Sequence, residues 1–122
     1  LQHPGEDEVE VLHVYDIPFD RRIELILHRQ ERSALREAYR RAAREKMDNW
    51  LGAMQDPKAR WQVVLGRGDP RKIILDHARR RRTDLIAVGS KDRSGTARLR
   101  IGSVALAIVR YASCDVLVVR SE

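Results

Sequence analysis

The sequence predicts an α/β fold, a single domain over residues 1–122 in which an open, twisted, mainly parallel sheet carries helices on both faces. Short segments rich in valine, isoleucine and leucine alternate along the chain with longer segments whose apolar residues recur every three or four positions. This alternation is typical of parallel strands joined by crossover helices. A length of 122 residues fits one hydrophobic core.

The first half of the chain is expected to form a strand, a long helix and a second strand. Residues 9–15 are rich in valine and end at Asp16-Ile17-Pro18, as a strand does before a turn. Residues 61–65 have the same character. Between them, apolar residues at helical spacing predict one buried stripe that stops at Asp56-Pro57. The stripe consists of Leu35, Ala38, Tyr39, Ala42, Met47, Trp50, Leu51 and Met54.

The second half contains a helix with clear start and end signals. Gly66-Arg67-Gly68 turns the chain into this helix, with Asp69 as N-cap and Pro70 as first helical residue. Arginines 79–82 place cations near the negative end of its dipole. The remaining elements are predicted to be a buried strand at 84–88, a buried helix at 104–109 and a closing strand at 115–119.

The composition argues against several classes of protein. No apolar run approaches the roughly 20 residues that cross a bilayer, and residues 1–5 do not resemble a signal peptide, so a cytoplasmic location without a membrane span is expected. Cys114 is the single cysteine and has no neighbours at zinc-ligand spacing. The four histidines are too dispersed to predict a metal site.

The net charge of +6 permits attraction to nucleic acid, but the pattern of charges does not favour it. The arginines are scattered over helices that also carry acids, which indicates a solvated surface. No aromatic platform or recognition motif of the common nucleic-acid-binding modules accompanies them. Nucleic acid is therefore not an expected partner.

The candidate site is the segment from Gly89 to Val104, which joins the end of a buried strand to the start of a helix. In open parallel sheets, ligands bind beyond the carboxyl ends of the strands. Glycines allow a close approach of the backbone to an anion, while Gly102 and Ser103 place free N–H groups and a hydroxyl at a helix N-terminus. Phosphate is the predicted ligand. The alternative is that Gly89 only turns the chain and Ser103 only caps the helix.

Two common phosphate-binding motifs are absent. A Walker A loop would need lysine where Thr96 follows Gly95, and its spacing does not fit. The dinucleotide fingerprint would need a third glycine where Arg71 follows Gly66 and Gly68. These two glycines are more simply explained as shaping the turn into the helix.

The segment resembles the universal stress protein family, whose nucleotide-binding members carry Gly-x2-Gly-x9-Gly-Ser/Thr after the fourth strand. Gly89, Gly102 and Ser103 match the first glycine, the third glycine and the hydroxyl residue at the spacing of that motif. The resemblance covers about residues 9–120 and is strongest from Gly66 onward. It includes Gly68-Asp69-Pro70, the run 83–90, Arg93-Ser94-Gly95, the run 102–105 and the run 114–119.

The resemblance implies an adenine nucleotide α-hydrolase-like fold, a role in stress response, and ATP as ligand, with Mg²⁺ as a further partner. No dedicated general base lies near the segment, so no catalytic residue is assigned and at most slow ATP hydrolysis is expected. The protein is more simply a binding domain than an enzyme. The residues implied around the phosphates, ribose and adenine are Gly89, Asp92, Gly102, Ser103 and Val104, with Val14 on the adenine side.

Asp92 stands where the family motif has its second glycine. Its carboxylate would face the phosphates, and two like charges about 4 Å apart repel by about 4 kcal/mol at an effective dielectric near 20, before screening. Lys91, Arg93 and Arg98 would offset part of this repulsion, or a Mg²⁺ ion would bridge Asp92 to a phosphate. The alternative function is therefore a family member that binds no nucleotide and acts as a dimeric regulatory or interaction module. It would form a homodimer through the C-terminal strand, whose apolar edge at 116–119 favours pairing.

Family domains begin with a central strand of the form Ile-Leu-Val-x-Val-Asp, and this usual first strand is absent from the chain. Without it, the strand pair that begins at Val9 and Trp61 is not expected to hydrogen-bond to the pair that begins at Asp84 and Val116. Each buried backbone group left unpaired costs about 1 to 3 kcal/mol. We therefore expect upstream residues or another chain to supply this strand.

Overall fold

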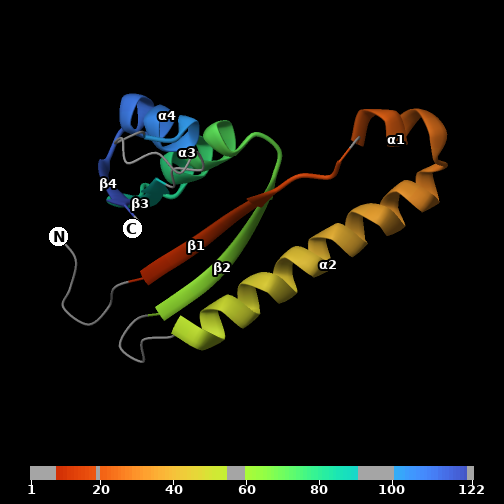
Figure 1. Ribbon diagram of the computed structural model, residues 1–122, viewed down its shortest axis with the longest axis horizontal. Helices are drawn as coiled ribbons and strands as arrows, with labels where there is room; N and C mark the ends of the chain where they lie inside the picture. The colour runs from red at the N-terminus through yellow and green to blue at the C-terminus, as the bar shows by residue number, and fades with distance from the viewer. Residues whose placement is uncertain (1–7, 19, 55–59, 91–100, 121–122) are drawn as a thin grey trace. The chain divides into compact units, whose positions relative to one another are not determined.

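The computed structural model describes residues 8–18, 20–54, 60–90 and 101–120. The elements in order are β1 (Glu8–Tyr15), α1 (Asp20–Ile26), α2 (Arg29–Met54), β2 (Arg60–Arg67), α3 (Pro70–Arg80), β3 (Leu85–Ser90), α4 (Ser103–Tyr111) and β4 (Asp115–Arg120) (Figure 1). Both strand pairs are parallel, so the predicted α/β fold with parallel strands is confirmed. The chain divides into two compact units, residues 1–68 and 69–122. That it is a single domain stays a prediction.

The first unit is built on the parallel pair β1–β2, which runs in register from Glu8 opposite Arg60 to Tyr15 opposite Arg67. A parallel connection needs a crossover segment, and α1 and α2 supply it. Helix α2 runs alongside the two strands and contacts both of them (Figure 1). Gly68 ends this unit at a φ of 130°, and its N–H donates to the carbonyl oxygen of Tyr15. The prediction that Gly66 and Gly68 shape this turn is confirmed for Gly68, whereas Gly66 lies within strand β2.

The buried face of α2 is narrower than the sequence stripe. Ala43 and Met47 are buried, and Leu35 and Leu51 are half-buried on the same face, because residues four apart lie above one another on a helix. The prediction that Ala42 belongs to this face is wrong, since its neighbour Ala43 takes that place. The other members of the predicted stripe that stay exposed are Ala38, Tyr39, Trp50 and Met54.

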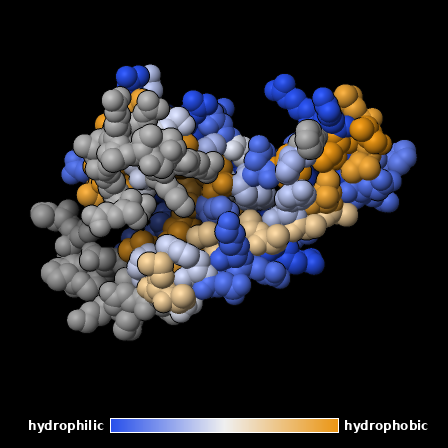
Figure 2. Space-filling model, in the orientation of Figure 1, coloured by the Kyte–Doolittle hydropathy of each residue, from blue (hydrophilic) through white to orange (hydrophobic). Residues whose placement is uncertain are grey.

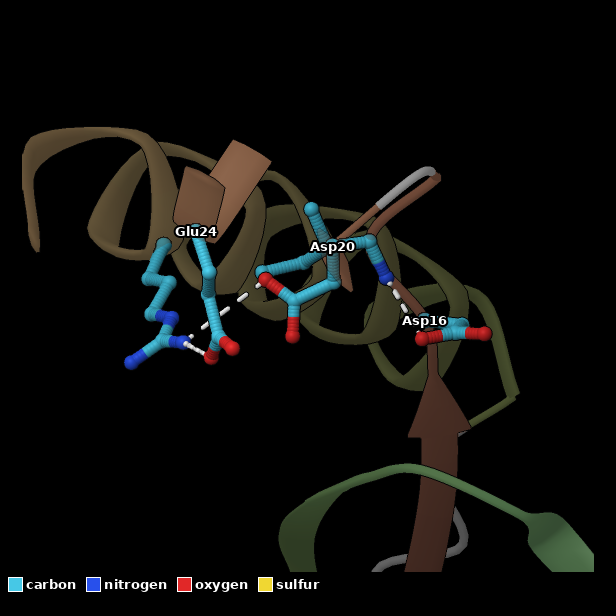
Figure 3. A network of polar contacts seen from close by, with 5 residues as sticks. Asp16, Asp20 and Glu24 are labelled. Carbon is cyan, nitrogen blue, oxygen red and sulfur yellow. Dashed lines mark hydrogen bonds and ion pairs between the residues drawn. The ribbon is translucent and has the colours of Figure 1, made fainter. Parts of the chain in front are cut away.

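Helix α1 is tied to α2 by charged side chains rather than by burial. The Arg36 guanidinium pairs with Glu24 at 2.8 Å and with Asp20 at 3.7 Å (Figure 3). The Asp16 carboxylate accepts a hydrogen bond from the N–H of Ile17, a buried residue that precedes the helix. Exposed ion pairs contribute about 0 to 1 kcal/mol each, so this attachment is weak.

The C-terminal end of α1 exposes two large hydrophobic side chains. Leu25 is 87% exposed and Ile26 is 76% exposed. Figure 2 shows hydrophobic residues gathered at this end of the first unit.

None of the described helices combines the length and apolar character that a membrane span requires.

The second unit begins with α3, whose predicted start is confirmed. Asp69 is the N-cap and accepts a hydrogen bond from the N–H of Arg71, with Pro70 at the first helical position. The helix ends where Arg82 adopts a φ of 51° and the N–H of Thr83 returns to the carbonyl of Ala78. This left-handed residue closes the helix in the manner of a Schellman motif.

Strands β3 and β4 pair in parallel from Leu85 opposite Asp115 to Ser90 opposite Arg120. Helix α4 contacts both strands and α3, and it buries Ala105 and Ile108. On the strands, Leu85, Leu117 and Val119 are each about half exposed. They alternate with half-buried neighbours, so one face of this pair carries the contacts and the other stays open.

The described strands form two sheets of two strands each, β1 with β2 and β3 with β4. This agrees with the expectation that the pair beginning near Val9 and the pair beginning near Asp84 do not hydrogen-bond to each other. Every described strand therefore has an edge that pairs with no other described strand, and in a parallel sheet such edges are normally covered or paired.

We predict that protonation of His13 destabilises the folded chain. The pKa of His13 lies below its ordinary value of 6.5, because partial burial disfavours the imidazolium and the ammonium of Lys46 repels it. The unfolded chain thus binds more protons than the folded chain below about pH 6.5. Stability should fall as the pH drops from this value through the folded-state pKa.

Urea denaturation at a series of pH values checks this prediction. His13→Gln should flatten the pH dependence of the free energy of unfolding in this range. Lys46→Gln should raise the pKa of His13, as followed by NMR titration of the imidazole. An equally steep decline in His13→Gln would show that another group is responsible.

Candidate functional site

The predicted site residues of the second unit lie where β3 ends and α4 begins. Gly89 is in β3, Gly102 is the N-cap of α4, and Ser103 and Val104 are its first two residues. Val14 is in β1 of the first unit, opposite Gly66 of β2. Asp92 lies outside the described residues, as do its neighbours Lys91, Arg93 and Arg98.

Gly89 is not a turn residue. It lies within the extended strand β3 opposite Val119, so the alternative that it only turns the chain is wrong. A Cβ built on Gly89 would meet the Val119 carbonyl oxygen at 3.9 Å, which is an ordinary contact. Neither backbone conformation nor crowding by described atoms therefore requires glycine here. What a glycine provides at this strand end is an exposed backbone that a ligand can approach.

Gly102 also lacks a conformational reason to be glycine. Its φ of −65° and ψ of 160° are accessible to any residue. A Cβ built on it would have no described atom within 4 Å. The space in front of this helix end is thus open as far as the described residues go, and a side chain at position 102 would project into it.

The first turn of α4 leaves backbone donors for an outside acceptor. Its earliest helical hydrogen bond runs from the N–H of Leu106 to the carbonyl of Gly102, at 2.9 Å. The N–H groups of Ser103, Val104 and Ala105 precede this bond, and no described side chain caps them. Ser103 is an exposed first helical residue and not the N-cap, so the alternative that it only caps the helix is also wrong. Such a helix end attracts anions.

Ser90 also takes part in this site, although it was not among the site residues predicted from the sequence. Its hydroxyl oxygen accepts a hydrogen bond from the N–H of Gly102 at 3.1 Å, across a separation of twelve residues. The expectation that the Gly102 N–H is free is therefore wrong, because Ser90 uses it. The sequence signal was present, since Ser90 is a polar residue at the end of an otherwise apolar strand.

The described residues offer no metal centre of their own. No group of three or more histidine, cysteine, aspartate or glutamate side chains within them is arranged to hold a metal ion. The chemistry available from the described residues is anion binding by backbone N–H groups and one exposed hydroxyl, that of Ser103.

The chain is similar in sequence to known universal stress proteins. A sequence model of the Universal stress protein family matches residues 2–120. Universal stress protein YxiE of Bacillus subtilis is 36% identical over 59 residues, 48% of this chain and 40% of that protein. A putative universal stress protein of Staphylococcus epidermidis is 48% identical over 56 residues, 45% of this chain and 34% of that protein. The matched segments thus span less than half the length of these relatives.

The fold is similar to solved structures of longer chains. The hypothetical protein MJ0577 has a TM-score of 0.72 and 24% identity, with 99% of this chain and 80% of that chain covered. UspA from Lactobacillus plantarum has a TM-score of 0.68 and 22% identity, covering 93% and 77%. These likenesses support the predicted adenine nucleotide α-hydrolase-like fold. The family match over nearly the whole sequence confirms the resemblance: the chain belongs to the universal stress protein family.

Proposed function

We propose that this chain binds an adenine nucleotide, ATP with Mg²⁺, through the segment 89–104. We further propose that this binding is part of a stress response. The observation that carries the proposal is the start of α4. Its first-turn N–H groups have no described side-chain cap, and a Cβ on Gly102 would point into open space. A phosphate supplies the acceptor that such a helix end lacks.

Each site residue has a part in this proposal. The N–H groups of Ser103 and Val104 and the Ser103 hydroxyl bind phosphate oxygens, and Gly89 allows the ligand to approach the end of β3. Val14 lines the adenine side, as family membership suggests. Asp92 either repels the phosphates or shares Mg²⁺ with them. The chain acts as a nucleotide-binding domain with at most slow ATP hydrolysis, because no general base is assigned to it.

The predicted effect of Gly102→Ala is a loss of nucleotide affinity without loss of fold. The new Cβ meets no described atom and the backbone angles suit alanine, so the free energy of unfolding should change by less than about 1 kcal/mol. The same methyl group intrudes on a phosphate at this helix end, and the dissociation constant for ATP should rise at least about tenfold. Isothermal titration with ATP and Mg²⁺ measures the affinity.

Gly52→Ala is the matched control for this titration. Gly52 lies on α2 in the first unit, and a Cβ there also has no described atom within 4 Å. This variant should stabilise the helix by up to about 1 kcal/mol and leave ATP affinity unchanged. Absence of heat from the unaltered chain at millimolar ATP would overturn the nucleotide proposal, and equal affinity in Gly102→Ala would remove Gly102 from the site.

We further predict that Asp92→Gly strengthens ATP binding, by about tenfold once screening has reduced the charge repulsion. Asp92→Asn removes the charge but keeps the size of the side chain, so it separates repulsion from crowding. Titrations with and without Mg²⁺ provide the measurement. If both variants bind ATP more weakly, and only when Mg²⁺ is present, Asp92 acts as a metal ligand and the repulsion argument is wrong.

A second candidate function is the dimeric regulatory or interaction module without nucleotide. The observation that favours it is β4, which pairs with β3 alone among the described strands. Its Leu117 and Val119 are each 51% exposed. An apolar strand with an open edge is a surface that proteins normally cover, and a second copy of the chain paired through β4 would cover it.

We predict that charge on the open face of β4 weakens this association. Leu117→Lys should shift the chain from dimer to monomer in light scattering, because dimerisation would then desolvate an ammonium. Val109→Lys is the control, since Val109 is similarly exposed but lies on α4. A chain that stays monomeric at every concentration would refute the dimeric candidate, and a dimer that fails to bind ATP would favour it over the first.

A further inference from the structure

Ser90 is the only buried polar side chain among the described residues, with 8% of its surface exposed. It ends β3 on the face that also carries Ile86 and Val88, which are half-buried. A hydroxyl in such surroundings costs free energy unless it is hydrogen-bonded. The hydrogen bond from the Gly102 N–H offsets part of the cost of burying the Ser90 hydroxyl. The question is what this bond does for the start of α4.

The bond from Gly102 to Ser90 replaces a local helix signal that this sequence lacks. In a capping box, a glutamate or glutamine at the third helical position accepts a hydrogen bond from the N–H of the N-cap residue. Here the third helical residue is Ala105, which has no acceptor, and the N-cap is Gly102, which has no side chain. Ser90 supplies the missing acceptor from the strand. The start of α4 is thereby fixed to the end of β3, next to Gly89.

We propose that Ser90 is a positioning residue for the phosphate site. By occupying the Gly102 N–H at 3.1 Å, it keeps this group away from the ligand and aims the N–H groups of Ser103 and Val104 at the phosphate. This inference rests on the proposed nucleotide binding and assigns a separate role to each of the residues at the start of α4. Gly102 contributes space, Ser103 and Val104 contribute donors, and Ser90 holds all three in place.

The test compares Ser90→Ala with Ser90→Thr, which keeps the hydroxyl. In the chain without nucleotide, hydrogen exchange followed by NMR should show the Gly102 N–H exchanging at least about tenfold faster in Ser90→Ala and near the original rate in Ser90→Thr. The N–H groups of β4 that donate to β3 report whether the strand pair remains intact. This readout requires no ligand, so it is independent of the nucleotide proposal.

The second readout uses ATP with Mg²⁺, and separately inorganic phosphate. The ATP dissociation constant should rise about tenfold in Ser90→Ala and return toward the original value in Ser90→Thr. In the unaltered chain, bound ATP should shift the N–H resonances of Ser103 and Val104 more than that of Gly102. Inorganic phosphate, which has no adenine, should produce the same order of shifts at higher concentration.

Each contrary result has a distinct meaning. Faster exchange at Gly102 with unchanged ATP affinity would overturn the positioning role and leave the nucleotide proposal standing. A dominant ATP-induced shift at Gly102 would show that its N–H is itself a phosphate donor, and the inference would be wrong. If the unaltered chain binds neither ATP nor phosphate, both the nucleotide proposal and the positioning role of Ser90 are wrong. This outcome is seen in the unaltered chain, before any substitution is made.

Discussion

Parallel pairing of strands is the constraint on which the rest of this structure depends. Two parallel strands cannot be joined by a tight turn, so each pair needs a crossover segment. In the first unit α1 and α2 form that segment, and in the second unit it contains α4. Every crossover leaves a strand at its carboxyl end and returns through a helix. At the start of α4, the N–H groups of Ser103, Val104 and Ala105 have no cap from a described side chain.

Gly89 and Gly102, the two glycines near the junction of β3 with α4, differ from an ordinary turn glycine because their backbone angles do not require glycine. Gly68 has a positive φ and is needed by the backbone. Gly89 and Gly102 have ordinary backbone angles and no crowding from described atoms. We propose that Gly102, at the start of α4, and Gly89, next to the Ser90 that bonds to it, leave room for a ligand at one end of the β3–β4 pair.

The sequence predicted the elements well where local chemistry decides them. Asp69-Pro70 determines where α3 begins, and the apolar runs at β3 and β4 indicate the two strands that pair with each other. It predicted less well where tertiary contact decides. The phase of α2 depends on which residues meet β1 and β2, so the sequence could not choose Ala43 over Ala42. The Ser90 hydrogen bond joins residues twelve positions apart, so the sequence shows a polar residue at the end of an apolar strand but does not show its partner, Gly102.

The distribution of aromatic residues has a consequence for optical spectroscopy. Both tryptophans, Trp50 on α2 and Trp61 on β2, belong to the unit that ends at Gly68. The other unit has Tyr111 as its single aromatic residue. Intrinsic tryptophan emission therefore follows the environment of α2 and β2 and has no reporter within residues 69–122. Constant emission during a ligand titration leaves binding at α4 open, whereas a changed signal would show that the ligand alters the surroundings of Trp50 or Trp61.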